Sequence, residues 1–462
     1  MTNQRSVHQH ADAKARRVAV IGAGPAGLVC AKTLLMSGFD VVVFEKGSYV
    51  GGTWVYDNDN GRQFLYRNLH INTSKALTQF SDFPFPASTQ PIPDHRDMAA
   101  YFDAYARRFR LWDRIRFKSE VVCIEPVQGE GWDVGVKGAS VERFDFVVVA
   151  SGAFARPAHA QEFQRFSGTY LHSADYRAPE ALVGQRVCVV GCGNSAVDIA
   201  SDICTTAART FLIARSGVFV QPHFAFGVPF GDLVRRYLHR PWIPSALRRW
   251  IVARIVRGIH GPMTSHGFKP LTHRVHPTIS STIIQDILFR RVEVKRGVRR
   301  VDGRTLIFED GSSGEFDCVV GATGYVTEFP FIPQRILDTR QGLKLYKRIV
   351  APCARGLYFV GMINLDVPIN HACEKQSQWI AAVERHGIAL PTEADMLSDI
   401  DAKQRWLEKT YGTAARHALQ EDSDRYYAEL DPTLRRARKS LRAASRVAPT
   451  CGSASAVTLP PS

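Results

Sequence analysis

RVAVIGAGPAG, residues 17–27, is the stretch that decides the fold of this chain. Its first five residues form a short β-branched apolar run, which predicts a buried parallel strand. Gly22 permits the tight turn that follows, Gly24 lets the backbone approach a pyrophosphate, and Gly27 lets a helix pack closely on the strand. The phosphates would lie at the N-terminus of that helix. The stretch therefore predicts a dinucleotide-binding turn.

The residues after this turn complete a βαβ unit and indicate its ligand. Pro25 opens a helix that continues from Ala26 to Met36, and a strand follows at 39–44. Glu45 ends that strand, 18 residues after Gly27. A carboxylate there accepts hydrogen bonds from an adenosine ribose and repels a 2′-phosphate. We expect Glu45 and the adjacent Lys46 to bind FAD or NAD, not NADP.

A second stretch, RVCVVGCGNSA at 186–196, repeats the pattern. One such pattern recurs by chance, but two of them, each between an apolar strand and an amphipathic helix, indicate two nucleotides on one chain. Gly191 and Gly193 form the turn, and Ala196 replaces the third glycine while still allowing close packing. The spacing predicts strands at 186–190 and 210–214 with a helix at 194–204 between them.

The ligand of the second turn differs because no acid follows its second strand. Arg215 stands there instead, and its guanidinium can pair bidentately with a 2′-phosphate, although a surface cation is the alternative. Asn194 and Ser195 begin the helix, and Ser195 should reach the pyrophosphate. Asp198 is either a cofactor contact, a cap or a contact between domains. NADPH is therefore favoured over NADH at this site.

The fold class that follows is α/β, with two Rossmann-like dinucleotide-binding domains, the second inserted into the first. Each half closes with a strand, at 144–150 and 316–320, that ends in a small residue and a glycine. These closing steps supply four further cofactor-binding candidates: Ser151, Gly152, Thr323 and Gly324. The expected boundaries are a flexible tail at 1–16, an FAD domain at 17–168 and 326–446, an NADPH domain at 169–325, and a disordered tail at 447–462.

Composition agrees with an ordinary globular protein. The 462 residues are 45% apolar and 22% charged, with no apolar run long enough for a membrane span. The polar, basic N-terminus lacks the apolar core of a signal peptide. Nine scattered cysteines, never spaced CxxC, indicate reduced thiols in the cytoplasm.

The net charge of +15 gathers in two segments. One runs from Arg235 to Arg257, and the other follows Arg435 near the C-terminus. Neither has the interleaved stacking aromatics of a nucleic-acid module, so we expect no nucleic-acid partner. Solvated helix faces are one interpretation, and peripheral contact with an anionic surface is the other. Residues 233–259 accordingly predict either a pair of helices on the NADPH domain or an amphipathic membrane-surface helix.

Several further motifs occur in a fixed order along residues 17–430. They are GGTW at 51–54, NTSK at 72–75, FSDFPFP at 80–86, FSGTYLHSADYR at 166–177, HPT at 276–278, ATGY at 322–325, and Arg416, His417 and Gln420 with Tyr427 and Glu429. In this order they resemble the flavin-containing monooxygenase family.

The resemblance implies FAD in the first domain and NADPH in the second. It also implies that the reduced flavin captures O2 as a C4a-hydroperoxide, whose distal oxygen goes to a soft nucleophile. Asn72 would donate an amide hydrogen bond near the flavin and the oxidised nicotinamide, a turn residue being the alternative. Gly52, Thr53, Trp54 and Thr73 would lie along the cofactor, although Trp54 could equally be packing. We expect N- or S-oxygenation of a small amine or sulfide, with O2 as co-substrate.

Other interpretations stay open at this point. Baeyer–Villiger insertion into a ketone uses a related intermediate, but the fingerprint of those enzymes usually ends in Trp, where this one ends in Tyr176 and Arg177. A disulfide reductase would need a CxxC pair. A flavoprotein without catalytic activity is less favoured because the Asn72 motif is intact.

The sequence indicates the roles of a few residues, the substrate and the oligomeric state less clearly. His172 and Tyr176 suggest acid–base work, but domain positioning is favoured. His70 and His371 have no metal-like partners in the sequence, so we expect no metal. Residues 364–374 could line the substrate end of the flavin. The substrate is not fixed by the sequence, and a homodimer is the default expectation.

Overall fold

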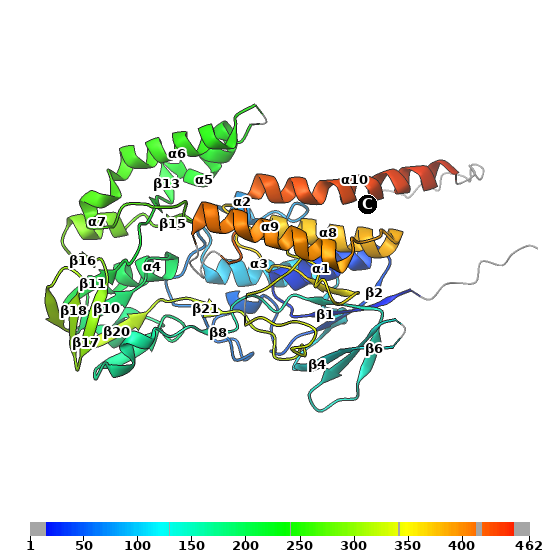
Figure 1. The fold of residues 1–462 in the computed structure, drawn as a ribbon, viewed down its shortest axis with the longest axis horizontal. Coiled ribbons are helices and arrows are strands. Elements are labelled where there is room, and N and C mark those ends of the chain that lie inside the picture. The colour runs from blue at the N-terminus through cyan, green and yellow to red at the C-terminus, as the bar shows by residue number, and fades with distance from the viewer. Residues whose placement is uncertain (1–14, 129, 241, 341, 413–417, 448–462) are drawn as a thin grey trace, which may run out of the picture.

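The computed structural model describes residues 15–447 except for 129, 241, 341 and 413–417. Nearly all of the tails expected at 1–16 and 447–462 lies outside the described residues, and so do Arg416 and His417. Within the described part, two five-stranded sheets form the framework, and all strand pairs in both are parallel. Figure 1 shows the second sheet to the left of the first.

The first sheet takes its strands from both ends of the chain. In spatial order they are β22 (Leu357–Phe359), β7 (Phe146–Val149), β1 (Arg17–Ile21), β2 (Asp40–Phe44) and β3 (Ile115–Arg116). The second sheet has the order β16 (Val292–Lys295), β11 (Arg209–Ile213), β10 (Arg186–Val190), β20 (Cys318–Gly321) and β9 (Thr169–His172). All strands of the second sheet fall between β7 and β22 in sequence. The segment that forms the second sheet is therefore inserted into the sequence of the first.

Helices cover both sheets. The longer ones are α1 (Pro25–Met36), α3 (His95–Arg108), α4 (Asn194–Ile203), α6 (Ser245–His260), α8 (Ile369–His386), α9 (Glu393–Tyr411) and α10 (Ser423–Val447). Shorter ones are α2 (Lys75–Thr78), α5 (Phe230–Leu233), α7 (Ile283–Leu288) and the 3₁₀ turn η1 (Gly52–Trp54). Small antiparallel sheets are β4 (Val121–Pro126) with β5 (Trp132–Val136) and β6 (Glu142–Phe144), and β17 (Val298–Asp302) with β18 (Thr305–Phe308) and β19 (Ser313–Glu315).

The apolar runs form strands because both faces of each sheet are covered. In β1, Val18 and Val20 join one buried cluster together with side chains of α1, α3, α8 and α10. Ala19 and Ile21 join another cluster on the opposite face, which includes residues of β4 and β5. A central parallel strand buried on both sides reads as a continuous apolar run, as here.

The glycine turns follow β1 and β10 as predicted, and the backbone requires glycine at their first positions. Gly22 has φ +107°, and a Cβ there would lie 2.8 Å from the carbonyl oxygen of Ala150. Gly191 has φ +124°, and its Cβ would lie 2.4 Å from the carbonyl oxygen of Ala322. Each first strand therefore turns directly against the end of its parallel neighbour, β7 or β20.

Residues 230–260 form a helical subdomain that stands away from the sheets at the upper left of Figure 1. It contains α5, a π-helical turn at Val234–Leu238 and α6. A hairpin of β13 (Phe224–Ala225) and β14 (Val228–Pro229) precedes it. Its own small core includes Phe230 and Val256. The helices expected at 233–259 are present.

Candidate active site

One cavity of about 1690 Å³ is lined by the turns of both sheets. Most of the cofactor-binding residues expected from the sequence line it. They are Gly22, Gly24, Pro25, Ala26, Glu45, Lys46, Gly52, Thr53, Trp54, Asn72, Thr73, Ser151, Gly152, Gly193, Asn194, Ser195, Ala196 and Gly324. Segments more than 300 residues apart in the chain are thus brought to one space.

Five expected residues do not line this cavity: Gly27, Gly191, Asp198, Arg215 and Thr323. The two glycines act through the backbone, since a Cβ on Gly27 would lie 1.9 Å from the carbonyl oxygen of Gly22. The hydroxyl of Thr323 donates to the carbonyl of Ala158. The side chain of Arg215 is 66% exposed, and it forms a long ion pair with Glu162, at 3.6 Å.

The first turn has the shape and the polar groups that a dinucleotide needs. A Cβ on Gly24 would lie 3.6 Å from the Cα of Gly52, so the two backbones face each other with no side chain between them. Glu45 is buried, and its two carboxylate oxygens accept hydrogen bonds from the backbone N–H groups of Ala23 and Gly47, both at 2.8 Å. Each oxygen keeps a further lone pair for a ribose hydroxyl.

Ser151 gives independent evidence that a ligand binds at the first turn. Its Oγ is buried and makes no hydrogen bond within the described structure, yet the residue lines the cavity. Buried hydroxyls without a partner are rare in proteins. The residues around the first turn therefore fit a bound dinucleotide.

The second turn is held open by local hydrogen bonds. The side-chain oxygen of Asn194 accepts from the backbone N–H of Ile279 at 2.8 Å. The hydroxyl of Thr278 donates to the carbonyl of Cys192, also at 2.8 Å. A Cβ on Gly193 would meet no heavy atom within 4 Å, so the N-terminus of α4 faces empty space. This geometry fits an anionic group at a helix N-terminus.

Asn72 lies in the segment between these turns with its amide uncommitted. The residue is exposed to the cavity, and no described side chain or backbone group hydrogen-bonds its amide. The following residues are fixed: the Oγ of Ser74 accepts from the N–H of Leu77 at 3.2 Å and donates to Asp232 at 2.6 Å. Asn72 is thus held on an ordered turn while its amide stays available.

The FSGTYLHSADYR stretch lies where the two sheets meet. Its histidine, His172, does not line the cavity. His172 is bonded to the carbonyl of Gly324 and to the N–H of Ala174, both at 3.1 Å. The hydroxyl of Tyr176 donates to Asp202 at 2.5 Å. The guanidinium of Arg177 donates to the side chain of Gln63 at 2.8 Å. Such satisfied contacts are those of positioning residues.

Asp198 lies at the same contact between the two sheets. The hydroxyl of Tyr66, from the segment before Asn72, donates to its carboxylate at 2.6 Å. Burial raises the pKa of Asp198 to about 6, against the hydrogen bond from Tyr66, which lowers it. Of the alternatives that the sequence left for Asp198, the structure shows the contact between domains.

Sequence reasoning missed the role of Glu374 at the start of α8. Its carboxylate accepts from the N–H and Oγ of Ser81, at 2.9 and 2.8 Å, and lies 3.1 Å from Nδ1 of His371. Burial raises the pKa of Glu374, but these hydrogen bonds outweigh it and hold the pKa below its ordinary value. His371 lines the cavity, so a buried carboxylate orients a cavity-lining imidazole. The i to i+3 spacing is the only sequence signal for this pair.

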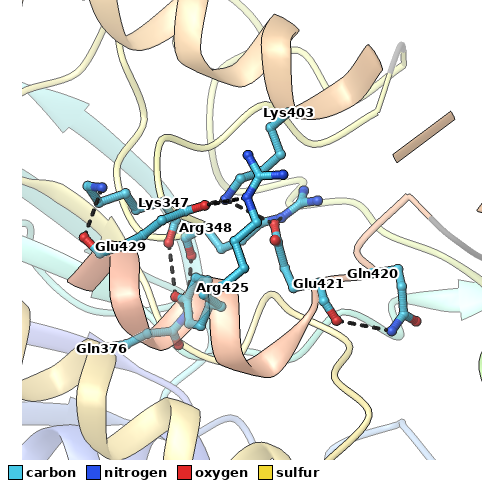
Figure 2. A network of polar contacts seen from close by, with 9 residues as sticks. Lys347, Arg348, Gln376, Lys403, Gln420, Glu421, Arg425 and Glu429 are labelled. Atoms are coloured by element: carbon cyan, nitrogen blue, oxygen red, sulfur yellow. Dashed lines mark hydrogen bonds and ion pairs between the residues drawn. The ribbon is translucent and has the colours of Figure 1, made fainter. Parts of the chain in front are cut away.

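A buried ion network behind the cavity was also unforeseen, and Figure 2 shows it. Glu421 is fully buried and accepts from Arg348 at 2.8 Å, with Lys403 at 3.3 Å. The adjoining Gln420 accepts from the amide of Asn364 at 2.9 Å, and both of these residues line the cavity. Lys403 of α9 also pairs with Glu429 of α10 at 2.7 Å, so the network connects one wall of the cavity to both helices.

Two other observations bear on the chemistry. The described residues include no group of three or more His, Cys, Asp or Glu side chains that could hold a metal ion. In the described part of the chain, no helix has the length and apolar content that crossing a bilayer requires.

Comparisons with known proteins agree with this geometry. Residues 15–441 match the family described as flavin-binding monooxygenase-like. Flavin-containing monooxygenase 5 of Oryctolagus cuniculus is 32% identical over 435 residues, with 88% of this chain and 80% of that protein covered. The structure of S-allyl-L-cysteine S-oxygenase from Allium sativum has a TM-score of 0.69 at 26% identity and covers 94% of both chains.

A closed crystal structure of cyclohexanone monooxygenase has a TM-score of 0.67 and covers 94% of this chain and 99% of that one. Its identity is 19%, so this likeness is one of fold alone. From the family match and the identity to its relatives, this chain belongs to the flavin-binding monooxygenase-like family and is a flavin-dependent monooxygenase that uses FAD and NADPH.

Proposed function

We propose that this monooxygenase transfers one oxygen atom from O2 to the nitrogen or sulfur of a small amine or sulfide. FAD binds in a domain of residues 17–168 and 326–446, and NADPH binds in a domain of residues 169–325. Both domains are Rossmann-like. The observation that carries the proposal is the single cavity, which the first glycine turn, the second glycine turn and Asn72 all line.

The first turn would hold FAD. Gly24 and Gly52 leave room for the pyrophosphate, Glu45 accepts from the ribose, and the Oγ of Ser151 gains the partner that it lacks. Once reduced by NADPH, the flavin supplies the activation of O2, which no side chain can provide.

The second turn would hold NADPH. Gly193 and Ser195 line the space at the N-terminus of α4, where phosphate is favoured by the backbone N–H groups and the helix dipole. Arg215, exposed and outside the cavity lining, would pair with the 2′-phosphate where the nucleotide extends beyond the cavity.

Asn72 would orient the reacting groups, because its amide is free to donate and accept within the cavity. The contacts of Tyr66 with Asp198 and of Arg177 with Gln63 join the two domains and would keep them in register, which positions one nucleotide against the other. With both nucleotides bound, the cavity would hold less of the water that otherwise releases hydrogen peroxide.

Separate incubations with two matched substrates test the reaction class. Purified protein loaded with FAD is incubated with NADPH, air and either thiane or cyclohexanone, which are six-membered rings with sulfur or a carbonyl. Sulfoxide without lactone is expected. Lactone without sulfoxide would establish Baeyer–Villiger insertion instead, and NADPH left unoxidised with both substrates would indicate a flavoprotein without this activity.

A cytoplasmic location and a homodimer complete the proposal. The eight cysteines of the described residues form no disulfide with one another, which suits a reducing compartment. A twofold dimer is the commonest oligomer of soluble proteins. Light scattering on the purified protein would give its mass, and a monomeric mass would refute the dimer.

A further inference from the structure

The lining of the cavity is unevenly charged. Around the first turn its charges balance: Lys46 pairs with Glu120 at 3.0 Å, and Arg62 and Glu45 are the other lining cation and acid. The part of the cavity lined by residues from 230–253, 271–277 and 364–375 is called here the distal end. Its described lining has one acid, Asp366, and five cations, which are Arg235, Arg248, Arg249, Arg274 and Lys375.

The carboxylates next to the distal end are shared between cations. The Oδ2 of Asp422 lies 3.1 Å from the guanidinium of Arg274 and 3.9 Å from that of Arg249. Burial raises the pKa of Asp422, but the hydrogen bond and charge of Arg274 outweigh burial and hold the pKa below its ordinary value. Arg274 also reaches Asp366 at 3.9 Å. Arg249 therefore shares its carboxylate with a nearer guanidinium, and 42% of its side chain stays exposed.

Two further cations of the distal end have no acidic partner in the part of the chain that the structure describes. Arg248 pairs with Asp424 of α10, but no described carboxylate pairs with Arg235 or Lys375. Lys375 is half-buried and follows His371 by one helical turn on α8. A partly buried ammonium without an anion is unfavourable, because water no longer solvates it fully. An anionic group at the distal end would relieve this cost.

The segment that carries Asn72 touches both elements that supply these two cations. The Oγ of Ser74 donates to Asp232 of α5 at 2.6 Å. Arg235 follows Asp232 by three residues where α5 continues into the π-helical turn, so the two are neighbours on the helix surface. The side-chain amide of Asn370 on α8 donates to a carbonyl of α2 at 2.7 Å. The cations of the distal end therefore lie on elements packed against the segment of the proposed reaction.

We propose that the distal end binds a carboxylate of the substrate, so that this enzyme prefers sulfides or amines that are also carboxylates. The inference rests on the proposed function, because the oxygen atom still goes to sulfur or nitrogen. One atom of O2 forms the new bond and the other leaves as water, while NADPH and a proton supply two electrons and the hydrogens. Arg235, Arg249 and Lys375 donate hydrogen bonds to the carboxylate. The carboxylate fixes one end of the substrate and leaves the soft atom toward Asn72.

The phosphates of NADPH are the competing anions for these cations. In the proposed binding mode they lie at the second glycine turn and at Arg215, which follow strands of the second sheet. Arg249 and Lys375 belong instead to α6 and α8. A test of the proposal therefore has to measure the substrate and NADPH separately.

Two sulfides of nearly equal size test the proposal. FAD-loaded protein is incubated with NADPH, air and either para-(methylthio)benzoate or para-(methylthio)benzamide, which differ in charge. The value of kcat/KM for the benzoate should exceed that for the benzamide about 10- to 100-fold, as expected for one hydrogen bond to a charged group. Equal values for the two sulfides would overturn the inference and leave the proposed function standing.

Calorimetry of the same two sulfides with FAD-loaded protein and NADP+ measures the preference without turnover. Tighter binding of the benzoate is expected. If the benzoate binds more tightly but neither sulfide yields sulfoxide, the proposed function is overturned and the carboxylate site stands. Equal binding of both sulfides would overturn the carboxylate site whatever the enzyme oxidises.

Matched variants locate the carboxylate site. Arg235→Gln with Arg249→Gln should lower the benzoate-to-benzamide ratio of kcat/KM about 10-fold or more, and Lys375→Gln should lower it as well. The control, Arg254→Gln with Arg257→Gln, removes the same charge from exposed positions of α6 outside the cavity lining. The thermal midpoint reports that each variant is folded. The control should keep the wild-type ratio, and an equal fall in the control would refute the site. A loss shared equally by both sulfides, with a raised KM for NADPH, would assign the cations to the cofactor and overturn the proposal.

Discussion

Replacement of Gly193 by alanine separates cofactor binding from folding at the second turn. Gly193 has φ −85° and ψ −178°, which any residue adopts, and its Cβ would meet nothing within 4 Å. Alanine is less favourable than glycine at an N-cap, which destabilises the folded variant. Alanine also lowers the conformational entropy of the unfolded chain, which stabilises the folded variant. Each effect is about 1 kcal/mol or less, and the two oppose each other. The free energy of unfolding should therefore change little.

In the proposed binding mode, the same methyl group would lie between the pyrophosphate of NADPH and the backbone of α4. Losing one hydrogen bond to a charged group costs about 1.5–3 kcal/mol. Since each 1.4 kcal/mol is a factor of ten, the dissociation constant for NADPH should rise about 10- to 100-fold.

The assay compares three proteins by their KM for NADPH, their thermal midpoint and their flavin content. Gly193→Ala should raise KM alone. Gly191→Ala should instead lower the thermal midpoint, because its Cβ would lie 2.4 Å from a carbonyl oxygen and its φ is positive. Unchanged NADPH affinity in Gly193→Ala, or a loss of stability as large as that of Gly191→Ala, would refute the assignment of this turn.

Three further predictions follow from the site. Arg215→Ala should raise KM for NADPH about 10-fold or more while leaving KM for NADH nearly unchanged, and equal effects on both would contradict a 2′-phosphate contact. Asn72→Ala should keep NADPH oxidation but convert most turnover into hydrogen peroxide, measured with peroxidase; full coupling in the variant would exclude an orienting role. Because the pKa of Asp198 is raised to about 6 in the folded protein, its contribution to stability is present below about pH 4 and is lost as the pH rises through about 6. Asp198→Asn should remove this decline, worth about 3 kcal/mol, from the pH profile of thermal unfolding, and an unaltered profile would contradict it.

Local sequence was sufficient for the strands and helices at the two turns. Residues 17–21 and 186–190 are short apolar runs followed by glycine. Strand length, burial and turn position could therefore be predicted from neighbouring residues. Boundaries shifted by one or two residues, as at β20, which runs from Cys318 to Gly321 where 316–320 was predicted. Strand ends depend on pairing with neighbours, which the segment itself does not encode.

The side-chain partnerships of the site could not be predicted because they join distant segments. Tyr66 meets Asp198 across 132 residues, and Ser81 meets Glu374 across 293. Neither pair has a spacing that a periodic pattern could reveal. The unpartnered Oγ of Ser151 is likewise visible only when its surroundings are known.

The charge pattern of the sequence predicted only part of how the arginines of the helical subdomain are used. The density of arginines at 235–257 was evident, and it left solvated faces and surface contact as alternatives. The fold separates the two sets of arginines, since Arg248 turns toward Asp424 while Arg254 and Arg257 stay on the outer side. A helical period alone does not say which side of α6 packs against the protein.

In the proposed reaction, reduced flavin in this cavity transfers one atom of O2 to a soft nucleophile. The most direct measurement is mass spectrometry of the product formed from thiane and NADPH under isotopically labelled dioxygen. We expect sulfoxide that carries one labelled oxygen atom, with one NADPH consumed for each product molecule. Unlabelled sulfoxide, or NADPH oxidation that yields only hydrogen peroxide, would contradict it.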